Sequence, residues 1–357
     1  MNILFLTPYP LKESPSQRFR FEQYFEILQN AGHSIRVQSF LTQYNWRQFS
    51  KPGQLTSVIF ALLGGLARRL LVLPTLYQYH VVFIHREVTP VGPPVLEWLI
   101  AKVFNKRIIY DFDDALWLTD KKYESFFLRT IKCRWKVRTI CRMSHRVSCG
   151  NDFLCQYARQ FNNNVIYNPT TIDTDFLHDP GRVPLRRSEK IIIGWTGSSS
   201  TLKYLKEIEG ILTDVEISYP QVQFKIIADQ EPLLQLQRLT FTKWNNETEI
   251  VDLGEFDIGI MPLPDDDWSK GKCAFKALQY MALEIPTVAS AVGVNVSVIN
   301  HGVNGFLVES IEDWKNCLGK LILHENLREE LGRKGRQTVV DNYSVRSNAS
   351  RFLALFI

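Results

Sequence analysis

The sequence lacks the features that mark secreted, zinc-binding or disordered proteins. Its six cysteines form no CxxC pair and have no histidine at the spacing of a zinc site, so we expect reduced, partly buried thiols. The apolar run near the N-terminus, NILFL, is short and soon followed by proline, which predicts a first β-strand rather than a signal peptide, and hence a cytoplasmic protein. No low-complexity stretch occurs, and 45% hydrophobic with 22% charged residues is typical of a folded soluble protein.

Long hydrophobic runs are scarce as well. Residues 58–73 are apolar, but they include Arg68 and Arg69 and fall short of the roughly 20 apolar residues that a membrane span requires. We expect this segment to form a helix that is partly buried or faces lipid.

Acidic residues are missing from residues 129–146, which contain eight basic residues with His145 included. Apolar residues between them, among them Ile131, Trp135 and Ile140, predict a basic amphipathic helix. Such a helix either rests on an anionic membrane or is a solvated face of a basic domain. Nucleic-acid binding is not expected, because no recognisable nucleic-acid-binding module surrounds the segment.

The length of 357 residues predicts two domains. In each half, short apolar runs typical of strands alternate with helical patterns such as residues 20–31 and 202–212, which predicts an α/β fold with two doubly wound parallel sheets. Residues 168–190 contain many turn residues and are expected to link the domains. The strands are expected at residues 2–6, 33–40, 81–84, 107–112, 146–149, 164–166, 190–195, 222–228, 256–261, 287–289 and 305–308.

A helix is expected over residues 272–283, with Lys272, Lys276 and Gln279 on one polar stripe. The helix follows a strand and a long loop, so it should begin at the carboxyl edge of the sheet, where open α/β sheets bind ligands. Two lysines at the positive end of a helix suit a diphosphate. A solvated lysine face is the alternative.

The loop GWTGSSST is a second candidate phosphate site. Gly197 would let the backbone approach a phosphate, and Ser198 and Ser199 would supply donors. No GK[ST] follows, so this is not an ATP-binding P-loop. After the first strand, Arg18 is expected to bind the same diphosphate, and Arg20 is expected to bind a second substrate, the acceptor. The alternative is that both are ordinary surface arginines.

Five segments, in order along the chain, resemble the signature blocks of the retaining glycosyltransferases of family 4 (group 1), in particular a bacterial branch with a GWxGSxST loop. The segments are IYNPTTIDTDFL, IIIGWTGSSSTLKYL, FDIGIMPL, FKALQYMALEIPTVAS and GVNGFLV. The resemblance implies a GT-B fold, in which two Rossmann-like domains face a central cleft. Residues 1–170 would then bind the acceptor and residues 171–342 the nucleotide sugar, and a last helix of about residues 343–357 would cross back to the first domain.

The resemblance also implies a reaction. A sugar would pass from a UDP or GDP sugar to the acceptor with retention of configuration and without a metal or cofactor, while the leaving diphosphate helps to deprotonate the acceptor hydroxyl. The protein must then stabilise the charge that develops on the diphosphate. The basic segment fits a saccharide or lipid-linked acceptor on the inner membrane face, in the synthesis of surface polysaccharide or lipopolysaccharide.

The sequence departs from the family at the donor site. The family's two glutamates fall at Gly271 and Gln279, and Gln279 would accept from the ribose hydroxyls without a charge. The usual arginine and lysine of the loop fall at Trp195 and Ser200, so Lys272 and Lys276 are expected to replace them. A catalytically weak partner subunit and a sugar-nucleotide 2-epimerase of the same fold are the alternative functions.

In the first half, the segment IIYDFDDALWL places Asp113 where the resemblance expects a histidine near the donor sugar. Asp113 and Asp114 are expected to contact the donor sugar or acceptor hydroxyls. Asp111 and Asp113 would share one face of a strand, so a metal-binding DxD is the alternative. His85 and Arg86 end another strand at the same edge and are expected to bind the acceptor, although a lone histidine is more often structural.

The base of the donor is expected near Gln279, with Trp244 and Glu247 at the border of its pocket. A tryptophan buried in the core is the alternative for Trp244.

Overall fold

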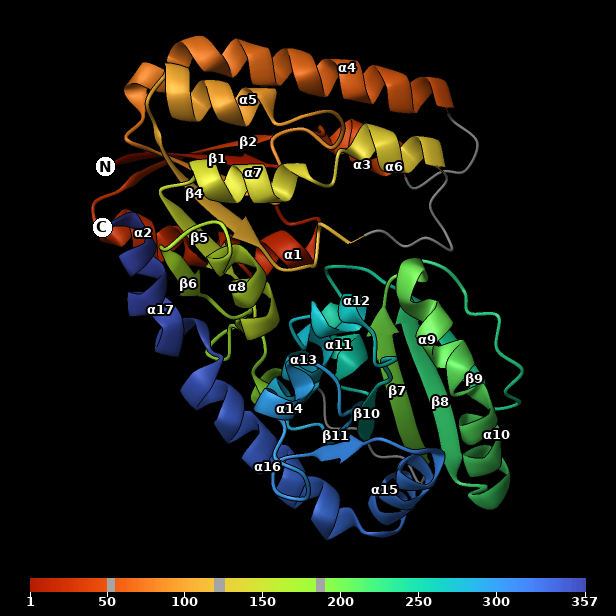
Figure 1. Ribbon diagram of the computed structural model, residues 1–357. Coiled ribbons are helices and arrows are strands. Elements are labelled where there is room, and N and C mark those ends of the chain that lie inside the picture. Colours follow the sequence, from red (N-terminus) through yellow and green to blue (C-terminus); the bar gives the residue numbers. More distant parts are fainter. Residues whose placement is uncertain (50–54, 119–125, 184–189) are drawn as a thin grey trace. The chain divides into compact units, whose positions relative to one another are not determined.

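Two parallel sheets of six strands organise the chain (Figure 1). The computed structural model describes residues 1–49, 55–118, 126–183 and 190–357. One compact unit, here unit 1, comprises Met1–Thr170 and Ala349–Ile357, and the other, unit 2, comprises Thr171–Asn348. Residues 343–348, which we expected in the returning C-terminal helix, are therefore part of unit 2.

The sheet of unit 1 has the order β2-β1-β3-β4-β5-β6 and is parallel throughout. Strands β1, β3 and β4 are almost continuously apolar because helices cover both of their faces. The strands are β1 (Asn2–Thr7), β2 (Ser34–Ser39), β3 (Val81–His85), β4 (Arg107–Phe112), β5 (Arg146–Cys149) and β6 (Val165–Tyr167). The pairing sets His85 beside Asp111, and Asp111 beside Ser148, near the carboxyl ends of three neighbouring strands.

Helices α4, α5 and α7 cover one face of this sheet, and α2 and α17 cover the other (Figure 1). On the second face, the ring of Phe5 lies 4.7 Å from that of Phe83 and 6.2 Å from that of Phe356. The helices of unit 1 are α1 (Pro15–Arg18), η1 (Glu22–Tyr24), α2 (Phe25–Asn30), α3 (Gln43–Phe49), α4 (Leu55–Val72), η2 (Leu73–Gln78), α5 (Val95–Trp98), η3 (Leu99–Val103), α6 (Phe126–Lys132), α7 (Lys136–Met143), α8 (Asp152–Arg159) and η6 (Ala354–Phe356), and α17 (Val345–Leu353) enters from unit 2.

Three helix expectations for unit 1 were wrong in detail. The helix expected at residues 20–31 is α2 preceded by the 3-10 turn η1. The basic segment is not one amphipathic helix, because Cys133 adopts a left-handed φ of 45° and separates α6 from α7. The apolar segment is longer than expected: with η2 it gives Thr56–Gln78, 23 residues that by length and composition alone could cross a membrane.

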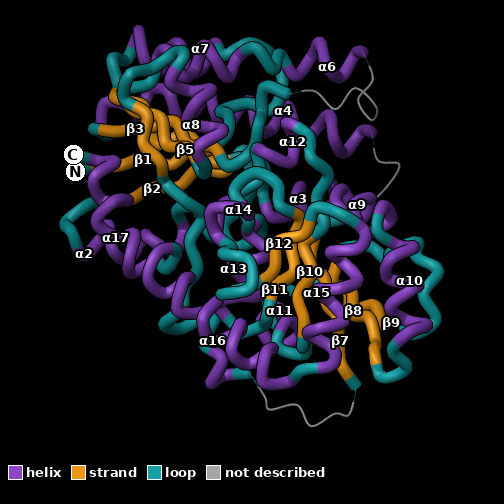
Figure 2. Tube along the Cα trace, turned by 60° about the horizontal axis from the view of Figure 1, so that its bottom comes forward, coloured by secondary structure: helices purple, strands orange, loops and turns teal. Residues whose placement is uncertain are grey.

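The sheet of unit 2 has the order β12-β11-β10-β7-β8-β9, again parallel. In Figure 2 its strands form a twisted layer with helices on either side. The strands are β7 (Ile191–Gly197), β8 (Val222–Ala228), β9 (Leu239–Lys243), β10 (Ile258–Met261), β11 (Thr287–Ser290) and β12 (Phe306–Val308). The helices are η4 (Pro180–Arg182), η5 (Ser199–Thr201), α9 (Leu202–Glu207), α10 (Glu209–Ser218), α11 (Glu249–Leu253), α12 (Asp267–Lys270), α13 (Phe275–Ala282), α14 (Asn295–Val298), α15 (Ile311–Leu323) and α16 (Glu325–Asn342).

Unit 2 differs from the sequence expectations at three places. Strand β9 was not predicted, and the helix expected at residues 202–212 is interrupted between α9 and α10. The expected linker is packed in its described part, because Arg336 of α16 donates hydrogen bonds to the carbonyls of Thr174 (3.1 Å) and His178 (2.8 Å).

The helix expected at residues 272–283 begins later, at Phe275. Ala274 has a left-handed φ of 53°, so the chain turns there and Lys272 lies outside the helix. Gln279 is fully buried rather than on an outward stripe with the lysines. The single polar stripe was therefore wrong, although Lys276 lies in the first turn of α13.

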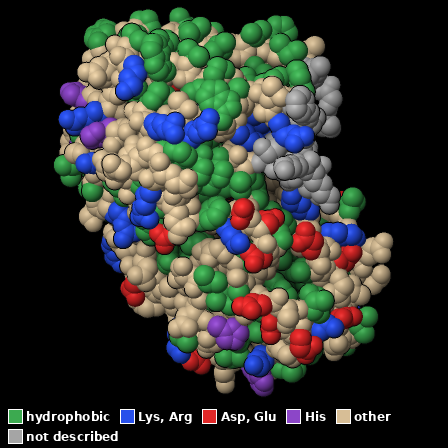
Figure 3. Space-filling model, in the orientation of Figure 1, with side chains coloured by type: hydrophobic (Ala, Val, Ile, Leu, Met, Phe, Trp, Pro, Cys, Tyr) green, Lys and Arg blue, Asp and Glu red, His purple; other side chains and the backbone are tan. Residues whose placement is uncertain are grey.

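The two units carry opposite net charges. Unit 1 has 23 Lys and Arg against 11 Asp and Glu, a net +12, whereas unit 2 has 19 against 26, a net −7. On the face drawn in Figure 3, acidic side chains gather over unit 2, while hydrophobic and basic side chains dominate unit 1. The net +5 of the whole chain hides this difference.

Candidate functional site

The loops that leave the strands of unit 2 are tied together at the carboxyl edge of its sheet. The backbone N–H of Thr196 in β7 donates to the hydroxyl of Tyr280 in α13 over 2.9 Å. After β10, the N–H of Leu263 donates to Ser290 Oγ at the end of β11, also over 2.9 Å. These hydrogen bonds thus connect β7 to α13 and β10 to β11 at one edge of the sheet, the edge where parallel α/β sheets bind their ligands.

Lys276 lies against the loop that follows β7. Its Nζ is 5.3 Å from the centroid of the Trp195 ring, which favours a cation. A Cβ atom at Gly197 would lie 2.8 Å from Lys276 Cε and 2.4 Å from the Trp195 ring, so glycine is required for this close approach. The structure therefore brings together Lys276 and the glycine-serine loop, two elements that the sequence predicted separately for a diphosphate.

Lys272 lies apart from this contact, on the other side of the turn at Ala274. Its Nζ is 5.1 Å from the ring of Trp268 in α12. It also lies near Tyr204: burial raises the pKa of that phenol, and the charge of Lys272 opposes the rise. Its predicted part in diphosphate binding stays a prediction.

The serines of the loop are not equally available to a phosphate. Ser199 donates to the carboxylate of Asp229, at the end of β8, from its N–H (2.5 Å) and from its hydroxyl (2.9 Å). Ser198 and Ser200 share a hydrogen bond of 2.8 Å at the surface. Asp229, which sequence reasoning missed, therefore competes with an anion for Ser199.

Trp244 and Gln279, two of the residues predicted around the base, contact Glu249 instead of the predicted Glu247. Gln279 Nε2 lies 3.4 Å from Glu249 Oε1 and 3.4 Å from His178 Nε2, and Trp244 Nε1 donates to the same Glu249 oxygen over 3.1 Å. Glu249 is 3% exposed, whereas Glu247 is exposed. Within the described residues, Gln279 Oε1 is buried without a hydrogen-bond partner. The spacing of KWNNETE does not distinguish the two glutamates, so Glu249 was missed.

In unit 1, Asp111 is the centre of a buried polar network. Its carboxylate pairs with the guanidinium of Arg20, accepts from Ser148 Oγ over 2.6 Å and lies 2.8 Å from His85 Nδ1. Burial alone would raise the pKa of Asp111, but Arg20 and His85 outweigh this effect and lower it. Asp111, Arg20 and His85 are at most 1% exposed. The observed partners of Arg20 and His85 are thus internal, and their acceptor roles stay predictions.

Arg86 holds the two carboxylates that follow β4. Its guanidinium lies 2.8 Å from oxygens of both Asp113 and Asp114, and the three side chains are 12–19% exposed. Arg86 has a left-handed φ of 62° at the end of β3, which turns its side chain toward the neighbouring strand end. Burial would lower the pKa of Arg86, but the two aspartates outweigh it and raise the pKa. These predicted site residues therefore form one cluster that reaches the surface.

The alternative DxD metal site does not match this geometry. Strand β4 ends at Phe112, so Asp111 and Asp113 do not share a strand face as we expected. Asp111 faces Arg20 and His85, whereas Asp113 faces Arg86.

Arg18, predicted for the diphosphate, belongs to unit 1, and its guanidinium lies 4.9 Å from the ring of Phe19.

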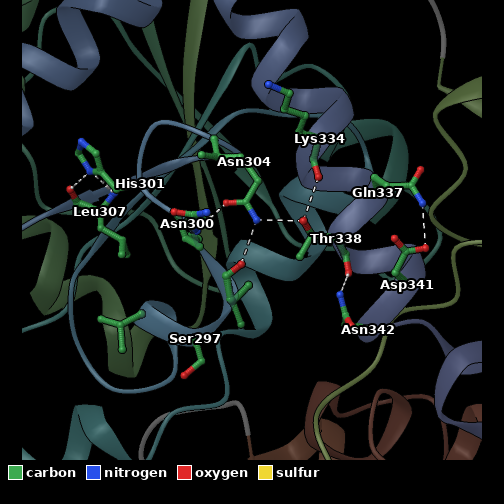
Figure 4. Close-up of a pocket in the computed structure, with 14 residues that line it drawn as sticks. Ser297, Asn300, His301, Asn304, Leu307, Lys334, Gln337, Thr338, Asp341 and Asn342 are labelled. Carbon is green, nitrogen blue, oxygen red and sulfur yellow. Dashed lines mark hydrogen bonds between the residues drawn. The ribbon is translucent and has the colours of Figure 1, made fainter.

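A cavity of about 740 Å³ in unit 2 lies between the chain around α14 and helix α16 (Figure 4). Its polar side chains bond one another: Asn304 Nδ2 donates to Thr338 Oγ1 (2.9 Å) and Gln337 Nε2 to Asp341 Oδ1 (2.8 Å). The residues predicted for the donor and acceptor do not line it.

Comparison with known proteins bears on the unit that holds Lys276. The sequence profile of Glycosyl transferases group 1 matches residues 191–324, which include the loop after β7 and α13. Among curated protein sequences, none matches the chain.

Several solved structures resemble the whole chain in fold. The sucrose-phosphate synthase of Thermosynechococcus elongatus has 15% sequence identity and a TM-score of 0.73, over 100% of this chain and 98% of the other. A glycosyltransferase of Rickettsia africae has 15% identity and a TM-score of 0.71, over 99% and 97%. HepE of Anabaena, solved with UDP and glucose, has 14% identity and a TM-score of 0.64, over 100% and 99%. The predicted GT-B fold is confirmed, whereas family 4 membership stays a prediction.

Proposed function

We propose that the protein transfers a sugar from a nucleoside diphosphate sugar, with UDP or GDP as the leaving group, to a saccharide or lipid-linked acceptor. The observation that carries this proposal is the contact of Lys276 with the loop at Gly197, within the residues that match the group 1 glycosyl transferases. Glycosyl transfer leaves negative charge on the diphosphate, and a positioned ammonium group stabilises that charge most where it develops. HepE, which shares the fold, was solved with UDP and with UDP-glucose.

We infer that the reaction needs no metal and retains configuration. Lys276, supported by Lys272 and the first N–H groups of α13, would supply the positive charge that a divalent ion supplies in other transferases. The departing phosphate oxygen would then accept the proton of the acceptor hydroxyl, which attacks from the same face. Asp113 and Asp114, oriented by Arg86, are our candidates for contacts with sugar hydroxyls.

Titration calorimetry with UDP, GDP and ADP, each with Mg²⁺ and with EDTA, tests the donor site. We expect one diphosphate to bind equally under both conditions. Lys276→Met should weaken it by about 10- to 100-fold, the value of one charged hydrogen bond. Lys315→Met is the matched control, because Lys315 of α15 pairs with Asp214 of α10 at the surface, and the exchange should leave the affinity unchanged.

The outcomes separate the alternatives. An unchanged affinity in Lys276→Met would contradict the diphosphate site, and loss of binding in EDTA would contradict metal independence. If no diphosphate binds, the partner subunit is favoured, since Gln279 is buried and Gly271 offers no carboxylate. Conversion of the free nucleotide sugar without any acceptor would indicate the epimerase.

A further inference from the structure

Helix α4 is apolar on two opposite sides. The side that packs on the rest of unit 1 buries Ala61, Gly65, Arg69 and Val72, at helical spacing. The opposite side, here the apolar face, consists of large exposed residues. These are Ile59 (48% exposed), Phe60 (74%), Leu63 (59%), Leu66 (41%), Leu70 (50%) and Leu71 (74%). A surface helix of a soluble protein normally presents polar residues outward, so the apolar face needs a cover.

The buried side of α4 fixes the helix to unit 1. Arg69 Nε donates to the carbonyl of Val88 over 2.9 Å, and its two terminal nitrogens donate to the carbonyls of Gln38 and Thr7 over 2.7 Å each. A Cβ atom at Gly65 would lie 2.4 Å from the ring of Phe40, so the helix backbone rests directly on that ring. A helix that crossed a bilayer would lose these bonds and place Arg69 in hydrocarbon, which is costly. The length of Thr56–Gln78 therefore does not make it a span.

The stretch of sequence that contains α4 lacks acidic residues. No Asp or Glu occurs between Glu26 and Glu87, the part of the sequence that contains α4, and unit 1 as a whole carries a net +12. A partner that covers the apolar face must accept this positive surface. A second copy that docked through the same face would bring the same positive charge, which disfavours a symmetric dimer.

Helix α7 covers the same face of the sheet as α4 (Figure 1). Lys136 of α7 donates to the carbonyl of Thr89 over 2.7 Å, directly next to the Val88 carbonyl that Arg69 of α4 binds. The helices α4 and α7 therefore flank one short segment. The helices on this face of the sheet carry exposed cations: Lys102 in η3, and Arg138 and Arg142 in α7, of which Arg142 lies 5.1 Å from the ring of Phe161.

We propose that unit 1 docks on an anionic phospholipid bilayer, with α4 lying in the membrane plane and its apolar face among the acyl chains. The basic side chains of η3 and α7 then meet the phosphate groups of the lipids. The six apolar side chains, from Ile59 to Leu71, extend over about three and a half helical turns as a ridge, a shape suited to insertion rather than to holding a peptide. The inserted element is thus α4, and the segment 129–146 supplies charge.

Vesicle sedimentation with the full chain tests this docking. The vesicles are phosphatidylcholine alone or an equimolar mixture with phosphatidylglycerol. We expect binding to the anionic vesicles that the triple variant Phe60→Ser, Leu63→Ser and Leu71→Ser weakens by about 100-fold. The matched control is Ile217→Ser, Leu233→Ser and Ile311→Ser, whose side chains are exposed by 74%, 91% and 64% on unit 2. The control should bind like the wild type.

A second variant, Lys102→Gln with Arg138→Gln, should weaken binding only to the anionic vesicles and reduce its dependence on salt. Melting temperatures near that of the wild type show that the variants are folded, since exposed side chains change stability little. The proposal would be overturned by no preference for anionic vesicles, by equal binding of the α4 variant, or by a wild-type dimer that the α4 variant dissociates. Resistance to alkaline carbonate would equally overturn it in favour of a span. Sedimentation requires no donor, so these results are independent of the proposed glycosyl transfer.

Discussion

Replacing Asp111 by asparagine should destabilise unit 1 by about 3 kcal/mol. The exchange keeps the size of the side chain and removes the carboxylate that pairs with the buried guanidinium of Arg20. Breaking a buried ion pair from one side costs about 3–5 kcal/mol, because a charge stays in the interior without its counter-charge. The asparagine oxygen can still accept from Arg20, which places the expected loss at the lower end of this range.

Differential scanning calorimetry measures this loss. For a unit of this size, about 3 kcal/mol corresponds to a fall of roughly 6–12 °C in melting temperature. Glu26→Gln is the control within unit 1, because Glu26 is exposed in the first turn of α2 and its neutralisation should cost less than about 1 kcal/mol.

The loss should also depend on pH. The pKa of Asp111 is lower in the folded protein than its ordinary value of 3.8, so the carboxylate stabilises the fold above that value. Its contribution disappears as the pH falls through the folded pKa. Wild type and variant should differ fully at neutral pH and begin to converge below about pH 4. A destabilisation under about 1 kcal/mol at pH 7 would refute the reasoning.

Gly197→Ala should weaken diphosphate binding about tenfold in calorimetry, because the new Cβ would lie 2.8 Å from the side chain of Lys276. Gly210→Ala is the control and should have no effect on binding, because no atom lies within 4 Å of its new Cβ. Gly332→Ala should cost more than about 2 kcal/mol in urea unfolding, since its Cβ would lie 2.0 Å from the backbone carbonyl of Glu284 and α16 would have to move; unchanged stability would contradict this close packing. Arg86→Met should reduce kcat/KM by about 100-fold and leave diphosphate affinity unchanged, because it releases both aspartates in unit 1, and an equal loss in affinity would argue against separate sites.

Most strands of both sheets could be predicted because a parallel strand covered on both faces is a continuous apolar run. The runs at β1, β3 and β10 have this form. Strand β9, LTFTK, lies at the end of its sheet and alternates apolar with polar residues, so its run is weak. The start of α13 was missed because the left-handed φ of Ala274 has no signal in its own residue type.

The sequence predicted which edge of the sheet holds the candidate site, but it did not predict which side chains pair with one another there. Carboxyl ends of parallel strands meet at one edge, so Gly197, Lys276 and the residues after β4 were expected to matter. The partners of buried groups come from distant parts of the chain: Arg20 and Asp111 are 91 residues apart, and Gln279 and Glu249 are 30 apart. A single sequence carries no pattern that links such positions, which explains why Glu249 and Asp229 were missed.

Unit 1 draws its core from both ends of the described chain. The ring of Phe352 stacks on Tyr24 at 4.2 Å, and that of Phe356 lies 6.1 Å from Phe83. A ribosome that makes this protein completes all of unit 2 before it adds these last aromatic residues to unit 1. The earlier strands must therefore wait, with the rings of Phe5 and Phe83 still open to water, until translation has passed residue 356. The order of synthesis thus makes unit 2 the first part of the protein able to fold completely, and unit 1 completes its core only afterwards.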